Sequence, residues 1–535
     1  MKSKFLSLFF IIIFILSLTG CSKDLPTRIQ YDLEEEPTTL DPQCATDKSA
    51  FLVINNLFEG LITIDPSGNL VNGLAEDHSV SEDGLTYHFT LRANQKWSNG
   101  YPLTANDFVF AFQRLFDPST RSQMATSFYC IQNAQAIAEQ GADINSLGVR
   151  ALSDTELEIK LDYANSMFLQ LLTTSAAMPC NEQFFYESKG IYGMEAKAMI
   201  SCGPFQLNSW VHKDDGYIKL NKNEHYFNQT NVAINGATLW TDTPKEEQLS
   251  RFLEGTTHVY LYSGKTDSKI SEQDDIQLSN YQNTVWGIMM NTQHSQLSNE
   301  NLRKALAYCL DRERYQNILP PYLSVAKGII PPGILLNNIS YREQANTIPY
   351  LNYNLEQAHL AYEAALQELN VKKLDPLTLL VPSNSDIRHQ EYFSYLSQTI
   401  QKEFNIFIAV EEASESAISQ KISSSKDYDM AIICLSANYN HPMSILNQFS
   451  PGNQNAVYQM HNQQYQQNTN QILLNTDPNL ILQSCIQAEQ ILLNNAIILP
   501  LYYQTDYLAT TNSIDGVLMN PQNGYLSFRY AFFHN

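Results

Sequence analysis

The sequence lacks the short motifs that mark the common catalytic and metal-binding sites. No two of its 11 histidines lie four residues apart, so no helix would present the paired imidazoles of a zinc site. It contains no Cys-x-x-Cys, G-x-S-x-G, G-x-G-x-x-G or Walker sequence. We therefore expect no metal, no cofactor and no enzymatic activity. An exported hydrolase stays open as an alternative, because a catalytic triad needs no local motif.

Basic side chains are scarce. The 535 residues include 33 Lys and Arg against 55 Asp and Glu, a formal net charge of -22. Because nucleic-acid binding depends on neutralising phosphates with Lys and Arg, this balance disfavours a nucleic-acid partner. The length favours two or three domains over a single core.

The one run of apolar residues that stands out is at the N-terminus. Lys2 and Lys4 accompany a stretch of Phe, Ile and Leu over residues 5–18. That stretch is shorter than the roughly 20 residues of a membrane span and is typical of a secretory signal. It ends in "LTGC", which resembles the lipobox of bacterial lipoproteins. We expect a signal peptide over residues 1–20, a lipid anchor on Cys21, and a mature protein of charge -24 outside the cytoplasm, on the periplasmic or cell-surface side. The alternative is an uncleaved signal anchor.

Cysteine usage does not indicate a disulfide framework. Without Cys21 an odd number remains, namely Cys44, Cys130, Cys180, Cys202, Cys309, Cys434 and Cys485. Cys309 and Cys485 lie on apolar helix faces and are predicted to be buried, inert thiols. Cys180 and Cys202 are the only pair that we consider as a possible bridge.

Strand and helix patterns alternate irregularly along the chain. Thr104 with Asp107 forms a capping-box pattern that predicts the start of a helix, and Asp477 before Pro478 predicts another. Residues 354–370 are also predicted to be helical. Strands are expected at 85–92, 155–161, 377–382 and 496–503. The pattern indicates α/β or mixed α+β domains.

Several longer stretches carry a resemblance to a known family. They are "EGL" at 59–61, "GLAE", "YHFTLR", "KWSNG", "TANDFVFAFQRL", "LDP" at 40–42, "SCGPFQLNSW", "IKLNKNEHYF", "LRKALAYCLDRE" and "ILPLYY". With these the chain resembles the extracellular solute-binding proteins of bacterial oligopeptide and dipeptide ABC transporters. The resemblance extends over nearly the whole mature chain.

The resemblance implies a two-lobed, periplasmic-binding-protein-like α/β fold of the large three-domain type, with the ligand enclosed between the lobes. The implied domains are a discontinuous first-lobe domain (28–65, 190–282 and 505–535), an accessory domain of the first lobe (66–189) and a second lobe (283–504). We expect a monomer.

The resemblance also implies where the ligand binds. Ser436, Ala437 and Asn438 would offer ligand-pairing backbone, opposite the stretch from Thr46 through Asp47 to Lys48. Trp286, in "NTVWGIMMN", is the best aromatic cleft candidate, with a core position as the alternative. Met124, in "SQMATSF", falls near a position that is often Tyr in peptide binders, and core packing explains it as well.

One position departs from the family pattern. Peptide-binding members carry an Asp that pairs with the ligand's ammonium terminus where this chain has the neutral Asn438. A peptide with a free amine then needs another acid, for which Asp47 is the nearest candidate, or a wetter site. Asp47 as an ordinary solvated turn residue is the alternative.

These features predict a lipoprotein that captures short peptides and delivers them to an ABC permease. The same fold could instead bind a modified or cell-wall peptide, a metal chelate or a sugar. A surface adhesin is the alternative outside this class.

Overall fold

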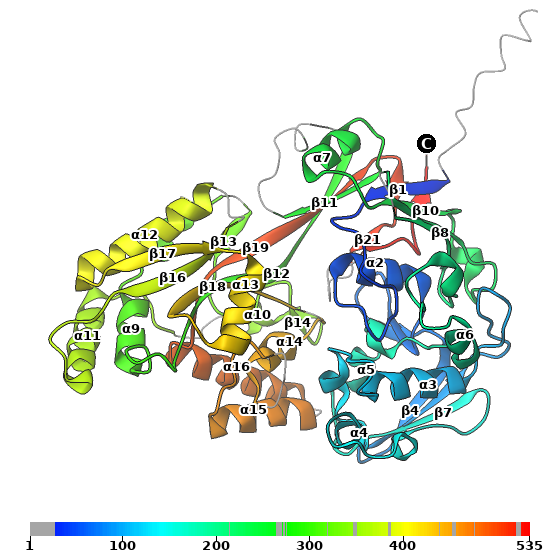
Figure 1. Cartoon of the computed structure of the whole chain (residues 1–535), viewed down its shortest axis with the longest axis horizontal. Coiled ribbons are helices and arrows are strands. Elements are labelled where there is room, and N and C mark those ends of the chain that lie inside the picture. The colour runs from blue at the N-terminus through cyan, green and yellow to red at the C-terminus, as the bar shows by residue number, and fades with distance from the viewer. Residues whose placement is uncertain are drawn as a thin grey trace, which may run out of the picture.

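The described part of the chain forms two lobes that lie side by side (Figure 1). The computed structural model describes residues 27–212, 215–263, 270, 273, 275–317, 319–320, 322–345, 350–383, 387–437, 439–451, 456–475, 477–519 and 526–534. The predicted signal peptide and Cys21 lie outside these residues. Within the described ranges, no helix is both long enough and apolar enough to span a bilayer.

A sheet of 11 strands extends through both lobes. Its first-lobe strands are β1 (Arg28–Asp32), β8 (Phe205–Val211), β9 (Tyr217–Lys222), β10 (Gly236–Trp240) and β11 (Val259–Ser263). Its second-lobe strands are β16 (Leu377–Pro382), β17 (Ile408–Ala413) and β18 (Met430–Ser436). Between the two groups lie β12 (Ile276–Met290) and β19 (Ile498–Thr511), and the short β13 (Leu323–Val325) pairs with β19.

The strands β12 and β19 connect the two halves of this sheet. Up to Tyr281, β12 pairs with the part of β19 that also pairs with β11 of the first lobe, whereas from Thr284 it pairs with β18 of the second lobe. The register shifts between these two residues, as in a β-bulge, which bends a strand. The predicted domain boundaries at 282/283 and 504/505 fall inside these strands and stay a prediction. The strand expected at 496–503 continues to Thr511, because its second half belongs to the first lobe.

The accessory part of the first lobe is built on a second sheet, of order β4-β5-β7-β6. Its strands are β4 (Ala75–Val80), β5 (Thr86–Leu91), β6 (Val149–Ala151) and β7 (Glu156–Lys160). The helix α3 (Ala105–Phe116) begins with the predicted capping box, in which the Thr104 N–H donates to Asp107 over 2.7 Å. Burial raises the pKa of Asp107 to about 6. The strands expected at 85–92 and 155–161 pair with each other as β5 and β7.

Helices cover both faces of the second-lobe sheet. They are α9 (Glu300–Tyr308), α11 (Leu355–Leu369), α12 (Ile387–Phe404), α15 (Gln463–Leu474) and α16 (Pro478–Asn494). Side chains of β12 alternate between two cores, since Val285 and Met289 lie in one cluster and Ile288 and Met290 in the other. The helix expected after Asp477 is confirmed, with Pro478 in its first turn.

The disulfide considered between Cys180 and Cys202 is absent, because both are free thiols. Each sulfur packs on a different group: Arg114 Nη1 lies 3.5 Å from Cys180, and the backbone N–H of Glu59 donates to the Cys202 sulfur at 3.4 Å. Burial raises the pKa of Cys180 to about 12 and that of Cys202 further. Cys309 and Cys485 are buried free thiols, as predicted.

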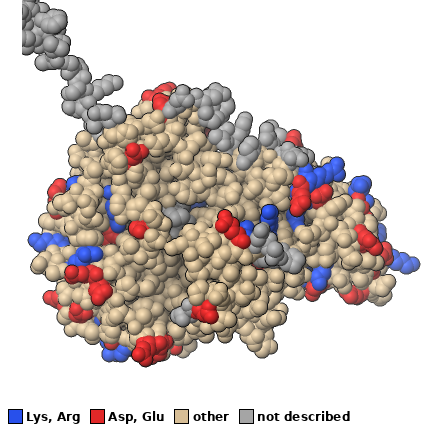
Figure 2. Space-filling view, turned by 180° about the vertical axis from the view of Figure 1, so that it is seen from behind, with Lys and Arg blue, Asp and Glu red and all other residues tan. Residues whose placement is uncertain are grey.

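Acidic and basic side chains are interspersed on the face of the molecule in Figure 2, without a continuous basic surface. The described residues contain no group of three or more His, Cys, Asp or Glu placed to hold a metal ion.

Candidate functional site: a cavity between the two lobes

Residues of both lobes line one cavity next to the bend in β12. We call it the interlobe cavity; its empty volume is about 770 Å³, including the solvent at its mouth. The first lobe contributes Leu33, Glu34, Lys48 and Ser49, and the second contributes Asn283, Thr284, Ser436 and Ala437. Asp506, on β19, also lines it. A site between two bodies encloses its ligand when they close.

The helix α2 (Lys48–Leu57) places Lys48 and Ser49 at the first-lobe wall. Asp47 caps this helix: its carboxylate accepts the Ala50 N–H over 2.6 Å and the Thr38 hydroxyl over 2.7 Å. Such a cap stabilises a helix by about 1 kcal/mol. Both oxygens of Asp47 therefore serve the local fold.

Paired strands form the second-lobe wall. Thr284 lies opposite Ser436, and Trp286 lies opposite Cys434, so the four side chains share one face of the sheet. The hydroxyls of Thr284 and Ser436 are 3.1 Å apart. The carbonyl of Ser436 accepts a hydrogen bond from the Gln448 amide over 3.1 Å. The Ala437 N–H donates to the carbonyl of Asn283 over 3.3 Å, so this N–H is already engaged.

Trp286 lies two residues after Thr284 on β12. It lines a second cavity, with an empty volume of about 860 Å³, which we call the Trp286 cavity. The helix α13 (Glu415–Gln420) and Cys434 form other parts of its wall. The indole N–H donates to Gln504 Oε1 over 2.8 Å, and the ring stacks on Tyr502 at 6.3 Å between centroids. Trp286 thus packs partly on the core and partly on a cavity, and its contact with a ligand stays a prediction.

The charges around these cavities have both signs. Glu34 and Lys48 are exposed, and Asp506 is half-buried. Burial, with smaller contributions from the carboxylates of Glu415 and Asp506, raises the pKa of the Cys434 thiol to about 12, while the Ser436 hydroxyl and Lys48 oppose the rise.

The remaining predicted residues lie elsewhere. Thr46 is exposed and lines neither cavity. Met124 is half-buried against the first-lobe core, which agrees with the packing alternative. Asn438 is outside the described residues. Glu34 and Asp506 also line the interlobe cavity and were not predicted from the sequence.

A third cavity, with an empty volume of about 940 Å³ that includes the solvent at its mouth, lies beside the buried ion pair of Glu59 and Arg529. Its described lining comes from the first lobe, the C-terminal segment and Tyr281. Because no described residue of β16, β17 or β18 lines it, lobe closure would not enclose a ligand there.

The lobes also touch away from the interlobe cavity. The Ser166 N–H and hydroxyl, in the accessory part of the first lobe, donate to the carbonyls of Leu473 and Ile472 over 2.7 and 2.9 Å. Those carbonyls lie in the last turn of α15, where backbone carbonyls have no N–H donor within their own helix. The Asn338 amide donates to Asn69 across the lobes over 3.2 Å. The chain is therefore in a conformation in which the lobes meet.

Comparisons with known proteins agree with this architecture. Residues 69–456 match the family described as bacterial extracellular solute-binding proteins, family 5 Middle. The oligopeptide-binding protein OppA of Bacillus subtilis (strain 168) is 27% identical over 520 residues, covering 95% of this chain and 93% of that protein. The dipeptide-binding protein DppE of the same organism is 25% identical over 515 residues, covering 93% and 90%.

Among solved structures, the substrate-binding domain of an oligopeptide ABC transporter from Bacillus anthracis str. Ames aligns with a TM-score of 0.78 at 25% identity. The alignment covers 96% of this chain and 100% of that chain. The two-lobed fold predicted from the sequence is confirmed. The chain belongs to the bacterial extracellular solute-binding proteins of family 5, which serve ABC transporters.

Proposed function

We propose that this protein captures oligopeptides outside the cytoplasm and delivers them to an ABC importer. The observation that carries the proposal is the interlobe cavity, whose walls come from both lobes next to the bend in the connecting strands. The relatives named above as oligopeptide- and dipeptide-binding proteins align with this chain over nearly its whole length, which supports peptides as the ligand class.

The end of β18 offers backbone carbonyls that could accept hydrogen bonds from the main chain of a peptide. The Ser436 carbonyl has a second lone pair beside the one that Gln448 uses, and the Ala437 carbonyl follows it. Each hydrogen bond to a ligand backbone would contribute about 0.5–1.5 kcal/mol whatever the ligand's side chains are. The Trp286 cavity, two residues along the strand, would take a ligand side chain.

The membrane anchor is part of the same proposal. Cys21 after "LTG" would carry lipid and hold the protein near its permease, and the protein would act as a monomer. In Cys21→Ala, incorporation of labelled fatty acid should be lost and the unprocessed precursor should accumulate. Labelling equal to that of the unaltered protein would refute the anchor without affecting peptide capture.

Native mass spectrometry of the gently purified protein tests the ligand class. We expect added masses that fragment as short peptides, and calorimetry should then show binding of synthetic peptides of the same sequences. The peptides should be recovered intact after incubation, because a receptor returns its cargo and a hydrolase does not. Cleaved peptides, or added masses that fragment as sugars or chelates, would contradict the proposal.

A further inference from the structure

We propose that an amide-rich face on α15 and α16 docks on the permease of the importer. The inference rests on the proposed function and names the surface through which cargo would be delivered. The face consists of exposed side chains along one side of α15 and in the first turn of α16, namely Gln463, Gln467, Asn470, Gln471, Leu474 and Leu480. Its α15 members recur at helical spacing, and the opposite side of that helix carries the buried residues, among them Tyr465 and Ile472.

The amide-rich face lies in a part of the chain that carries almost no charge. Over residues 430–505 the charged side chains are Asp477 and Glu489, whereas Asp, Glu, Lys and Arg make up 16% of the whole sequence. Glu489 is buried in an ion pair, so it does not reach the surface. Leu474 and Leu480 are 47% and 51% exposed. Exposed apolar groups on a surface without charges match the centre of a protein–protein interface, where charged residues are depleted.

The amide-rich face adjoins the first lobe. The Ser166 hydroxyl and N–H donate to the carbonyls of Ile472 and Leu473 at the end of α15. Three residues before Ser166, on the first-lobe side of this contact, Tyr163 is 43% exposed. Figure 1 shows the end of α15 beside α5 (Phe168–Leu171) of the accessory part. A partner that covers both sides of the contact would therefore bind the conformation in which the lobes meet, which is the one that would enclose a ligand.

A permease suits this face better than a lipid surface does. The chain has a formal charge of -22, so a membrane with anionic lipids repels most of its surface, and a face without acids meets the least repulsion. The face also lacks the Lys and Arg that bind lipid headgroups and the wide apolar stripe that inserts between them. Its side-chain amides both donate and accept hydrogen bonds, as a protein partner requires. The permease is the protein that cargo delivery requires at the membrane.

The test uses variants that place a charge on this face. Leu480→Glu brings a carboxylate to the first turn of α16, where the helix itself favours an acid. Gln467→Glu is a second variant, on α15. The matched control is Leu360→Glu on α11, where Leu360 is 59% exposed. Figure 1 shows α11 at the end of the second lobe that is farthest from the first lobe.

Peptide binding and peptide uptake are measured separately. Calorimetry with trialanine gives the affinity of each purified protein, and labelled trialanine gives the initial uptake rate of native cells that carry the same variants, after subtraction of the uptake that persists when the gene is deleted. We expect Leu480→Glu and Gln467→Glu to bind trialanine like the unaltered protein. Their uptake should be slower by about fivefold or more, because docking would bury a carboxylate without a partner. Leu360→Glu should match the unaltered protein in both measurements.

Photo-crosslinking in the same cells gives a second readout. With benzoylphenylalanine in place of Gln467, irradiation should produce an adduct with a permease subunit, identified by mass spectrometry. The adduct should become more abundant when trialanine is present, since the loaded protein has its lobes together. The same group in place of Leu360 should form no such adduct.

The outcomes separate this inference from the proposed function. Normal uptake with both variants of the face, an equal loss with Leu360→Glu, or a loss of trialanine binding in the face variants would overturn the docking assignment while peptide capture stands. Adducts with lipid alone, or with a second copy of this chain, would also overturn it and assign the face to the membrane or to a dimer. If the unaltered protein binds no trialanine, the proposed function fails first. If it binds trialanine but gene deletion leaves uptake unchanged, delivery fails and the docking assignment fails with it.

Discussion

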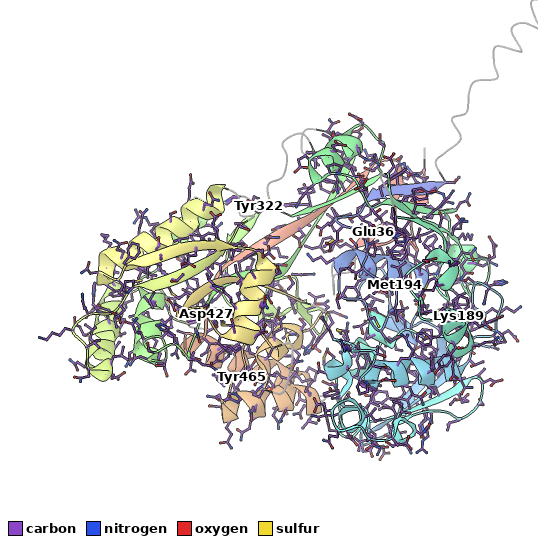
Figure 3. The ribbon with its side chains drawn as sticks, in the orientation of Figure 1. Glu36, Lys189, Met194, Tyr322, Asp427 and Tyr465 are labelled. Atoms are coloured by element: carbon purple, nitrogen blue, oxygen red, sulfur yellow. The ribbon has the colours of Figure 1, made fainter. Side chains whose placement is uncertain are left out.

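Removing the hydroxyl of Ser166 should weaken cargo binding although Ser166 lines neither the interlobe cavity nor the Trp286 cavity. Its side chain and backbone N–H donate to two carbonyls in the last turn of α15, across the lobe boundary. That helix is fixed to its own lobe by Tyr465, whose hydroxyl donates to the Leu446 carbonyl over 2.6 Å; Figure 3 labels Tyr465 in the second lobe. The contact therefore links one lobe to a rigid part of the other.

The magnitude follows from one hydrogen bond. When the lobes separate, water replaces the Ser166 hydroxyl at the Ile472 carbonyl, so the net contribution to the closed state is about 0.5–1.5 kcal/mol. Ser166→Ala keeps the backbone bond and loses the side-chain bond. A loss of about 1 kcal/mol reduces the closing equilibrium about fivefold, and the apparent affinity falls by the same factor where the open state dominates without ligand.

Calorimetric affinity and the rate of ligand release would measure this effect. The matched control is Ser188→Ala, which removes a similar hydroxyl-to-carbonyl bond, to Phe185, inside the first lobe. We expect about fivefold weaker binding, with most of the change in the release rate, for Ser166→Ala only. Equal affinity for Ser166→Ala and the unaltered protein, or an equal loss in both variants, would refute the reasoning.

Three further predictions concern the second lobe. Arg342→Met should lower the free energy of unfolding in denaturant by about 3–5 kcal/mol, since it leaves Glu489 buried without its cation; a loss below about 1 kcal/mol would contradict this. Burial lowers the pKa of His441 to about 3, so the unfolded state binds a proton first as the pH falls. Stability should therefore decrease by up to about 1.4 kcal/mol per pH unit from about pH 6.5 downward, and His441→Asn should reduce that slope, as measured by denaturant unfolding at several pH values. A maleimide should label Cys434 slowly, and bound peptide should prevent this labelling, as followed by mass spectrometry. The buried Cys485 should stay unlabelled in the folded protein. Labelling of Cys434 at the same rate with and without peptide would place the ligand elsewhere.

Local elements were predicted well where side-chain chemistry defines them. The Thr104 cap, the helix after Asp477 and the strand at 377–382 all follow from short-range rules. The helix at 354–370 has nearly the expected bounds, but only Ala358 and Ala365 are fully buried. It covers the outside of its lobe, and periodicity cannot tell how deeply a helix face is buried.

The site was predicted less completely, because it depends on long-range register. Ser436 lines the interlobe cavity because β18 pairs with a strand about 150 residues away, a relation that this sequence alone does not reveal. Asp47 caps α2, a role that was not predicted from the sequence, and its contact with a ligand stays a prediction. Asp506 was missed because its strand was expected to end at residue 503. The family resemblance pointed to a second-lobe segment that lines the interlobe cavity, and its contact with a ligand stays a prediction.

Photo-crosslinking tests most directly whether peptide cargo lies between the lobes. A bound tripeptide that carries a benzoylphenylalanine would be irradiated, and the attachment points would be mapped by mass spectrometry. The account predicts adducts on both walls of the interlobe cavity, near Leu33 to Leu52 in the first lobe and near Asn283 or Ser436 in the second. Adducts confined to one lobe, or clustered beside Glu59 and Arg529, would contradict it.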